Sequence, residues 1–188
     1  MNATSGKDLG VGTTWNTALW GEIGAAIDML ESAMQACPED VWSDPSKRPE
    51  WVRNDVVGFW YLVYHTLFML DYRLSDPAEP FAPPTPFNLD ELDPAGLLPE
   101  KPYTKDELQL YLGYCRKKCR ATIRALTQER ACERRRFGSD DRMFLEWLLE
   151  SMRHVQHHTA QLYLILRQKT ESAPRWVRQT KIELNGEE

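Results

Sequence analysis

The sequence lacks several features that would place it in large functional classes. Its longest apolar run, residues 56–70, is shorter than a membrane-spanning helix and is interrupted by Gly58 and His65. The first residues have no apolar stretch typical of a signal peptide. We therefore expect a cytoplasmic protein that has no membrane partner. A glycine-rich phosphate loop and a Gly-x-Ser-x-Gly nucleophile motif are also missing from the sequence.

The sequence has no excess of positive charge and little cysteine, with 23 basic residues against 28 acidic ones and four cysteines. A net charge of −5 and a pI near 5.5 argue against a nucleic-acid partner. The local exception, Arg134–Arg136, follows Glu133 at a helix end, and we expect it to cap carbonyl groups and keep a turn soluble. Four cysteines are too few for a disulfide scaffold, so we expect free thiols. Cys115 and Cys119 are four apart and could join a mixed His/Cys metal site, but buried core positions are favoured.

The 188 residues, of which 42% are hydrophobic and 27% charged, predict a single domain over 1–188. Apolar residues recur at helical spacing in four segments. We place the helices at about 14–36, 54–74, 104–131 and 141–170, with no convincing strand. The fold class is therefore all-α: a four-helix bundle over about 14–171, with a flexible arm at 1–13 and a tail at 172–188 that ends in a mobile terminus.

Local signals mark two of these helices and the segment between them. Thr104 and Glu107 form a capping-box pattern at the start of the third helix. The second helix, starting at Asn54 or Asp55, is apolar nearly all round, which suggests a bundle centre or a dimer interface. Eight prolines make a long irregular connection between the second and third helices, at 75–103, which permits a crossover.

Three of the four histidines lie in the last predicted helix. His154 and His158 are one helical turn apart, about 40° around the axis, so both imidazoles can point at the same ion. The fourth histidine, His65, lies within the apolar second helix. We predict that His65, His154 and His158 bind a metal ion in the bundle interior. Imidazole ligands suit zinc, nickel, iron and copper alike.

Other residues near the histidines could take part in binding or chemistry. His157 points about 60° away from His154, so it would either support the ligands from outside or lie at the rim. Gln161 could orient a ligand or line the cleft. Glu150, one turn before His154, could be a hydrogen-bond partner, a general base or an exposed carboxylate. Tyr61 is a candidate proton donor, although most tyrosines near His65 are expected to serve packing.

The string His154-Val-Gln-His157-His158-Thr-Ala-Gln161-Leu, together with His65 on an aromatic-rich helix, resembles the DinB/YfiT-like family. The resemblance covers about 15–167. It implies a four-helix bundle in which His65, His154 and His158 hold a metal, often nickel or zinc. Thr159-Ala160 replaces the Arg-Gly of many relatives, which affects contacts near that turn. Dimers are common in the family, so a homodimer is implied.

The family is similar to thiol S-transferases that use low-molecular-weight thiols. The first hypothesis is therefore a metal-dependent enzyme acting on a small-molecule substrate, either a thiol transferase or a hydrolase. A bound metal can deprotonate a coordinating thiol or lower the pKa of bound water. The second hypothesis is a non-catalytic metal-binding or stress-related protein in which the metal stabilises the bundle. An open coordination position would favour the enzyme.

Overall fold

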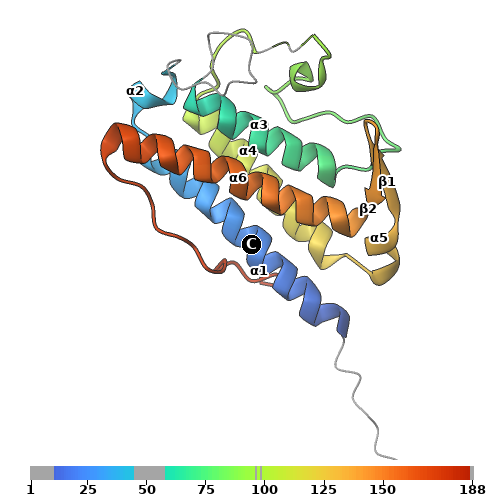
Figure 1. Ribbon diagram of the computed structural model, residues 1–188. Helices are drawn as coiled ribbons and strands as arrows, with labels where there is room; N and C mark the ends of the chain where they lie inside the picture. The colour runs from blue at the N-terminus through green and yellow to red at the C-terminus, as the bar shows by residue number, and fades with distance from the viewer. Residues whose placement is uncertain (1–10, 45–57, 96, 98, 187–188) are drawn as a thin grey trace, which may run out of the picture.

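The computed structural model describes residues 11–44, 58–95, 97 and 99–186, and over these residues the protein is mostly helical. Four long helices lie side by side: α1 (Val11–Ala36), α3 (Phe59–Leu74), α4 (Lys105–Arg124) and α6 (Phe144–Thr170) (Figure 1). Helices α1 and α3 each pack against both α4 and α6. Within the described part, no helix combines the length and the apolarity that a membrane crossing requires.

The connections contain short helices that the sequence analysis assigned to irregular chain or to longer helices. Helix α2 (Glu39–Trp42) follows α1, and a 3-10 helix, η2 (Asp90–Leu92), lies in the proline-rich connection of residues 75–103. The third predicted helix ends at Arg124 rather than near Ala131. A separate helix, α5 (Gln128–Cys132), follows, because the Thr127 hydroxyl accepts from the Arg130 amide and caps a new start.

Several predicted helix ends are confirmed. Helices α1, α3 and α6 end at the predicted residues, and Thr104 and Glu107 form the predicted capping box of α4. Helix α1 begins at Val11, three residues before the predicted start, so only part of the predicted 1–13 arm lies outside the described residues. The predicted start of the second helix, Asn54 or Asp55, also lies outside them.

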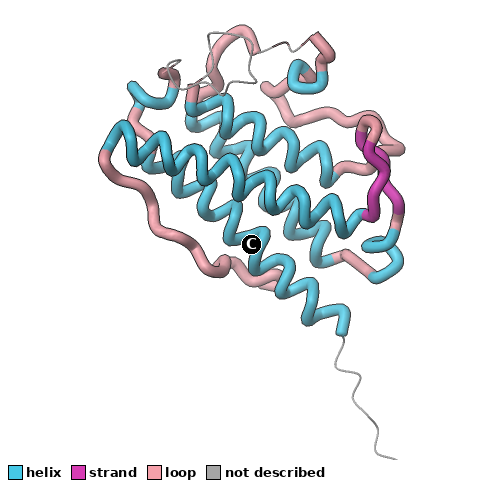
Figure 2. The backbone as a smooth tube through the Cα atoms, viewed as in Figure 1, coloured by secondary structure: helices cyan, strands magenta, loops and turns pink. Residues whose placement is uncertain are grey.

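The expectation of no strand was wrong. Strands β1 (Arg134–Phe137) and β2 (Asp140–Met143) form an antiparallel hairpin before α6, so this helix begins at Phe144 and not near Asp141 (Figure 2). Gly138 makes the turn possible, because its φ of 60° lies in the left-handed region. The hairpin also packs against α6, because the indole of Trp147 donates to the Arg135 carbonyl at 2.9 Å.

Tertiary packing explains why the arginine run forms a strand. Arg135 is buried, and its guanidinium lies 3.5 Å from the centre of the Phe144 ring. Arg134 and Arg136 point to the exposed side and approach Asp141 on the facing strand. The expected solubilising role therefore fits Arg134 and Arg136, whereas Arg135 anchors the hairpin through a cation–π contact.

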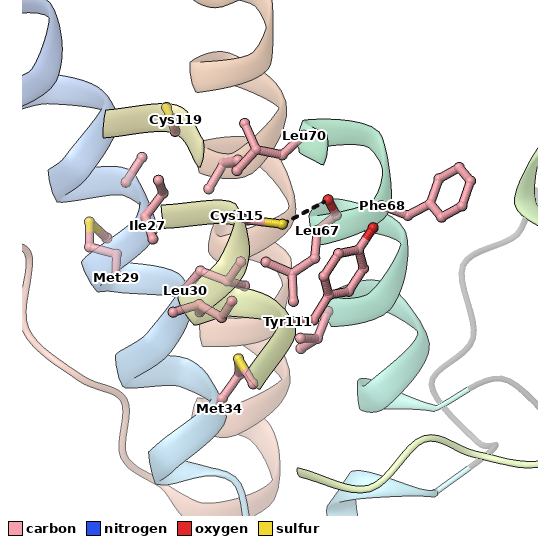
Figure 3. Close-up of a cluster of buried hydrophobic side chains, with 14 of the residues drawn as sticks. Ile27, Met29, Leu30, Met34, Leu67, Phe68, Leu70, Tyr111, Cys115 and Cys119 are labelled. Carbon is pink, nitrogen blue, oxygen red and sulfur yellow. Dashed lines mark hydrogen bonds between the residues drawn. The ribbon is translucent and has the colours of Figure 1, made fainter. Parts of the chain in front are cut away.

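The core lies between the long helices. Figure 3 shows aliphatic side chains of α1, including Ile27 and Leu30, meeting residues of α3 and α4. Cys115 and Cys119 are fully buried there, and the Cys115 thiol donates to the Leu67 carbonyl of α3 at 3.5 Å. Burial raises the pKa of both thiols, that of Cys119 to about 12, as expected for core residues.

Helix α3 is apolar because it is buried within a single chain. Twelve of its sixteen residues are buried. Aromatic residues of the proline-rich connection cover part of its outer side, since Phe81 packs on Phe68 and Phe87 stacks on Tyr64. Burial in the monomer therefore accounts for the apolar surface of α3, and the homodimer stays a prediction.

The tail was predicted at 172–188, ending in a mobile terminus. The C-terminal segment, residues 171–186, runs back along α1, and the last two residues lie outside the described part (Figure 1). The Trp20 indole of α1 donates to the Ile182 carbonyl at 2.6 Å, and the Thr180 amide donates to the Gly21 carbonyl at 3.2 Å. Arg120 of α4 donates to the Leu184 carbonyl at 3.1 Å and to the Gly186 carbonyl. Side chains from two helices thus satisfy the backbone of this segment, which its polar sequence did not indicate.

Candidate metal centre

The three histidines predicted as ligands come together where α3 and α6 pack against each other. His65 lies in the middle of α3, and His154 and His158 lie one turn apart on α6. The Nε2 atom of His154 is 3.1 Å from Nε2 of His65 and 3.2 Å from Nε2 of His158. We call these three residues the histidine cluster. Among the described residues, no other group of histidine, cysteine or acidic side chains has this arrangement.

Two of the three imidazoles are held by partners at their outer nitrogens. His65 Nδ1 contacts the carboxylate of Glu91, which comes from η2 in the proline-rich connection. His158 Nδ1 lies 2.7 Å from Gln161 Oε1. An acceptor at Nδ1 favours the tautomer that carries its proton there, which leaves the Nε2 lone pair directed inward. Both inner nitrogens are therefore prepared to bind a cation.

A single proton on His154 cannot pair with both of the histidine nitrogens that face it. Its Nδ1 is buried without a hydrogen-bond partner, so no neighbour fixes its tautomer. If Nε2 carried the proton, it could donate to only one of the two lone pairs that face it. A cation among the three Nε2 atoms would interact favourably with all of them. The donor set therefore fits a metal ion better than it fits a hydrogen-bonded histidine trio.

The spacing of the nitrogens also fits a metal. Two imidazole nitrogens bound to one tetrahedral zinc ion at 2.0–2.1 Å lie about 3.3 Å apart. The observed separations of 3.1 and 3.2 Å are close to that value. All three ligand atoms lie within 4.8 Å of one another, so the histidine cluster could surround a transition-metal ion.

Burial favours the uncharged form of two of the three histidines, His154 and His158. It lowers the pKa of His154 to about 2 and that of His158 to about 4, and the neighbouring imidazoles add to the effect in both cases. Arg73 contributes in the same direction. Neutral imidazole is the form that binds metals, so these two residues remain able to act as ligands well below neutral pH.

A cavity of about 660 Å³ borders the cluster on the side of His154. Helix α6, helix α1 and the C-terminal segment form its walls, through residues that include Glu150, His154, His157, Ala25, Ala26 and Trp176. Its volume is within the range of small-molecule sites. A ligand in this cavity could reach His154.

The other predicted residues lie around the cluster in different roles. His157 is exposed and lines the cavity, with its ring 5.0 Å from that of His158. Gln161 contacts His158, as predicted for a residue that orients a ligand. Glu150 forms an ion pair with Arg73 at 2.7 Å while also lining the cavity. Tyr61 donates to Glu91 at 2.9 Å, so it acts on His65 through that carboxylate.

Sequence reasoning missed Glu91 and Arg73. Glu91 lies 26 residues from His65 in a connection with no periodicity, and only its position in an acidic Asp-Glu-Leu-Asp run could have drawn attention to it. Arg73 is two helical turns beyond His65 on α3, and its pairing with Glu150 requires knowing which faces of α3 and α6 meet.

Comparisons with models of known protein families, with curated proteins and with solved structures find no match for this chain. The geometry of the histidine cluster and its surroundings is therefore the guide to function.

Proposed function

We propose that the protein is a metal-dependent enzyme in which His65, His154 and His158 hold a divalent transition metal, nickel or zinc. The observation that carries this proposal is the convergence of the three Nε2 atoms, with separations of 3.1 and 3.2 Å within the helical interior. We further propose that the four long helices form a bundle of the DinB/YfiT-like type, which agrees with the ligand positions that the resemblance implies.

The chain's own residues would prepare the centre in three ways. Glu91 and Gln161 hold His65 and His158 with their inner nitrogens available. Burial disfavours the imidazolium forms of His154 and His158. The cavity that His154 lines could hold a small molecule beside the centre. A divalent metal held there would supply Lewis acidity that lowers the pKa of a coordinating thiol or water.

The proposed reaction is the transfer of a low-molecular-weight thiol to a small electrophilic substrate. The cavity beside His154 favours an enzyme over a purely structural site, because a structural metal is enclosed by protein ligands. Metal-dependent hydrolysis is the alternative reaction. The carboxylate of Glu150 on the same cavity wall supports it, although the ion pair with Arg73 makes this carboxylate less available as a base.

Metal content tests the first part of the proposal. Purified protein should contain close to one nickel or zinc ion per chain by elemental analysis, and His65→Ala, His154→Ala and His158→Ala should each lose most of it. His157→Ala is the matched control, because this neighbouring histidine faces the cavity without joining the cluster, and it should retain the metal. Equal metal loss in all four variants, or no metal in the parent protein, would contradict the proposal.

Turnover tests the second part. A panel of electrophiles is offered with glutathione, bacillithiol or mycothiol, and with ester and amide substrates for hydrolysis. Thiol-dependent turnover that disappears in His154→Ala and returns on adding metal to chelator-treated parent protein is the expected result. A metal-loaded protein that turns over no substrate in either panel would instead support a non-catalytic metal-binding role.

A further inference from the structure

The C-terminal segment forms one wall of the cavity beside His154. Trp176 and Val177 line the cavity, and residues 180–186 are bound to α1 and α4 by the backbone contacts described above. The cavity therefore exists in its observed form only while this segment is docked. Residues that fix the segment also fix the shape of the cavity.

Two glycines on α1 allow the segment to approach closely. A Cβ atom at Gly24 would lie 2.6 Å from Cγ2 of Thr180, and one at Gly21 would lie 3.0 Å from Nε2 of Gln179. No side chain larger than hydrogen fits at Gly24 unless Thr180 moves. Because of this close approach, the chain that follows Trp176 lies on the surface of α1.

Trp176 is poorly explained as a core residue. Its side chain is 65% exposed, whereas Trp20, Trp42 and Trp60 are nearly completely buried. An indole left this open gains little from burial in the protein itself. Its position in the cavity wall gives it a surface on which a flat apolar molecule could pack.

Other residues of the cavity wall are also apolar, and its charged residues come close to balancing one another. Ala25, Ala26 and Met152 supply apolar surface. The charged residues of the wall are Glu22 and Arg153, which have opposite signs, and Glu150, which is paired with Arg73. An uncharged ligand would lose no hydration of a charge on entering, and the wall offers no excess charge to attract an ion.

We propose that this cavity binds the uncharged, apolar or aromatic part of the substrate, and that Trp176 is a specificity-determining residue that packs against it. In the proposed reaction this molecule is the electrophile, with its reactive end toward His154. The assignment as substrate rests on the proposed function, but the binding itself does not require a metal.

Fluorescence titration tests the binding with chelator-treated, full-length protein. The probe is N-phenyl-1-naphthylamine, an uncharged aromatic compound whose emission rises in apolar surroundings. Trp176→Ala should weaken its binding about fivefold or more, whereas Trp176→Phe, which keeps a ring, should remain within about threefold of the parent. Leu164→Ala is the control for removing an exposed apolar side chain, because Leu164 is 52% exposed and does not line the cavity.

A glycine pair tests the contribution of the docked segment. Gly24→Ala should displace Thr180 and weaken probe binding, whereas Gly113→Ala should not, because a Cβ atom at Gly113 meets nothing within 4 Å. Both changes put alanine into a helix, and circular dichroism establishes that each variant is folded. The anionic analogue 1-anilinonaphthalene-8-sulfonate should bind no more tightly than the uncharged probe.

The outcomes separate this inference from the proposed function. Unchanged probe binding in Trp176→Ala, or tighter binding of the anionic analogue, would overturn the inference even if the protein contains its metal. Conversely, the parent protein could bind the probe through Trp176 and yet contain no metal. That result would confirm the cavity as a binding site and contradict the proposal of a metal-dependent enzyme.

Discussion

Replacing Glu91 by glutamine should weaken metal binding at the histidine cluster. The Glu91 carboxylate contacts His65 Nδ1 and accepts the Tyr61 hydroxyl at 2.9 Å, and its side chain is only 7% exposed. Glutamine has nearly the same shape but no charge. Its single carbonyl oxygen can accept from one of the two donors, while its amide group faces the other as a second donor. The imidazole would then be held less firmly and would be a less basic ligand.

The expected loss is 10- to 100-fold in metal affinity, which corresponds to about 1.4–2.7 kcal/mol. The burial of Glu91 supports the upper part of that range, because solvent and salt screen a buried charge only weakly. Tyr61→Phe removes one donor to the carboxylate but leaves its charge in place. We therefore expect Tyr61→Phe to weaken metal binding less than Glu91→Gln does.

Asp90→Asn is the matched control, because it removes one negative charge from the adjacent residue of η2. Asp90 is bonded to Asn88 in an exposed contact and is not bonded to the histidine cluster. Affinity is measured by competition with a chromogenic zinc chelator, starting from metal-free protein. Asp90→Asn should change the affinity less than about twofold. If both variants lose affinity equally, or if Glu91→Gln binds metal as tightly as the parent protein, the contact of Glu91 with His65 does not orient this ligand.

Three further predictions concern stability and the C-terminal segment. The pKa values of His154 and His158 are lowered in the folded protein, so below about pH 6.5 the unfolded chain takes up more protons than the folded one. The free energy of unfolding of metal-free protein should therefore fall by up to about 1.4 kcal/mol per histidine for each pH unit between 6 and 4.5. Urea titrations should show a shallower dependence of this free energy on pH in His154→Gln. Thr104→Ala removes the hydroxyl that accepts from the Glu107 amide and should lower the free energy of unfolding by about 1 kcal/mol in the same assay, and a change below about 0.3 kcal/mol would contradict the cap's role. Arg120→Met removes the donors to the Leu184 and Gly186 carbonyls and should speed proteolysis within 171–186. Arg124→Met, at the exposed end of α4, is the control and should be cleaved at the parental rate.

The sequence was most informative where local rules decide the structure. The capping box at Thr104 and the ends of α1, α3 and α6 follow from residues close in the chain, and so does the pairing of His154 with His158. The approach of His65 to this pair was also predicted, because a bundle interior leaves few positions for a histidine on an apolar helix.

The parts that could not be predicted depend on contacts between distant residues. The hairpin at 134–143 forms because Arg135 packs on Phe144 and the Arg135 carbonyl accepts from the Trp147 indole. The charge pattern alone predicted a solvated turn instead. Glu91 reaches His65 only because the proline-rich connection folds back over α3. The docking of the C-terminal segment could not be predicted, because the donors that bind it, Trp20 and Arg120, lie more than sixty residues away.

The docking of residues 171–186 has a consequence for the timing of folding. This segment follows all four long helices in the chain, and its anchors lie on α1 and α4, which must already have met for both to be in place. During synthesis the helices can therefore assemble before the segment arrives. The cavity wall beside His154 would then form after the four helices have met, so any ion that the histidine cluster binds could enter before this wall is in place.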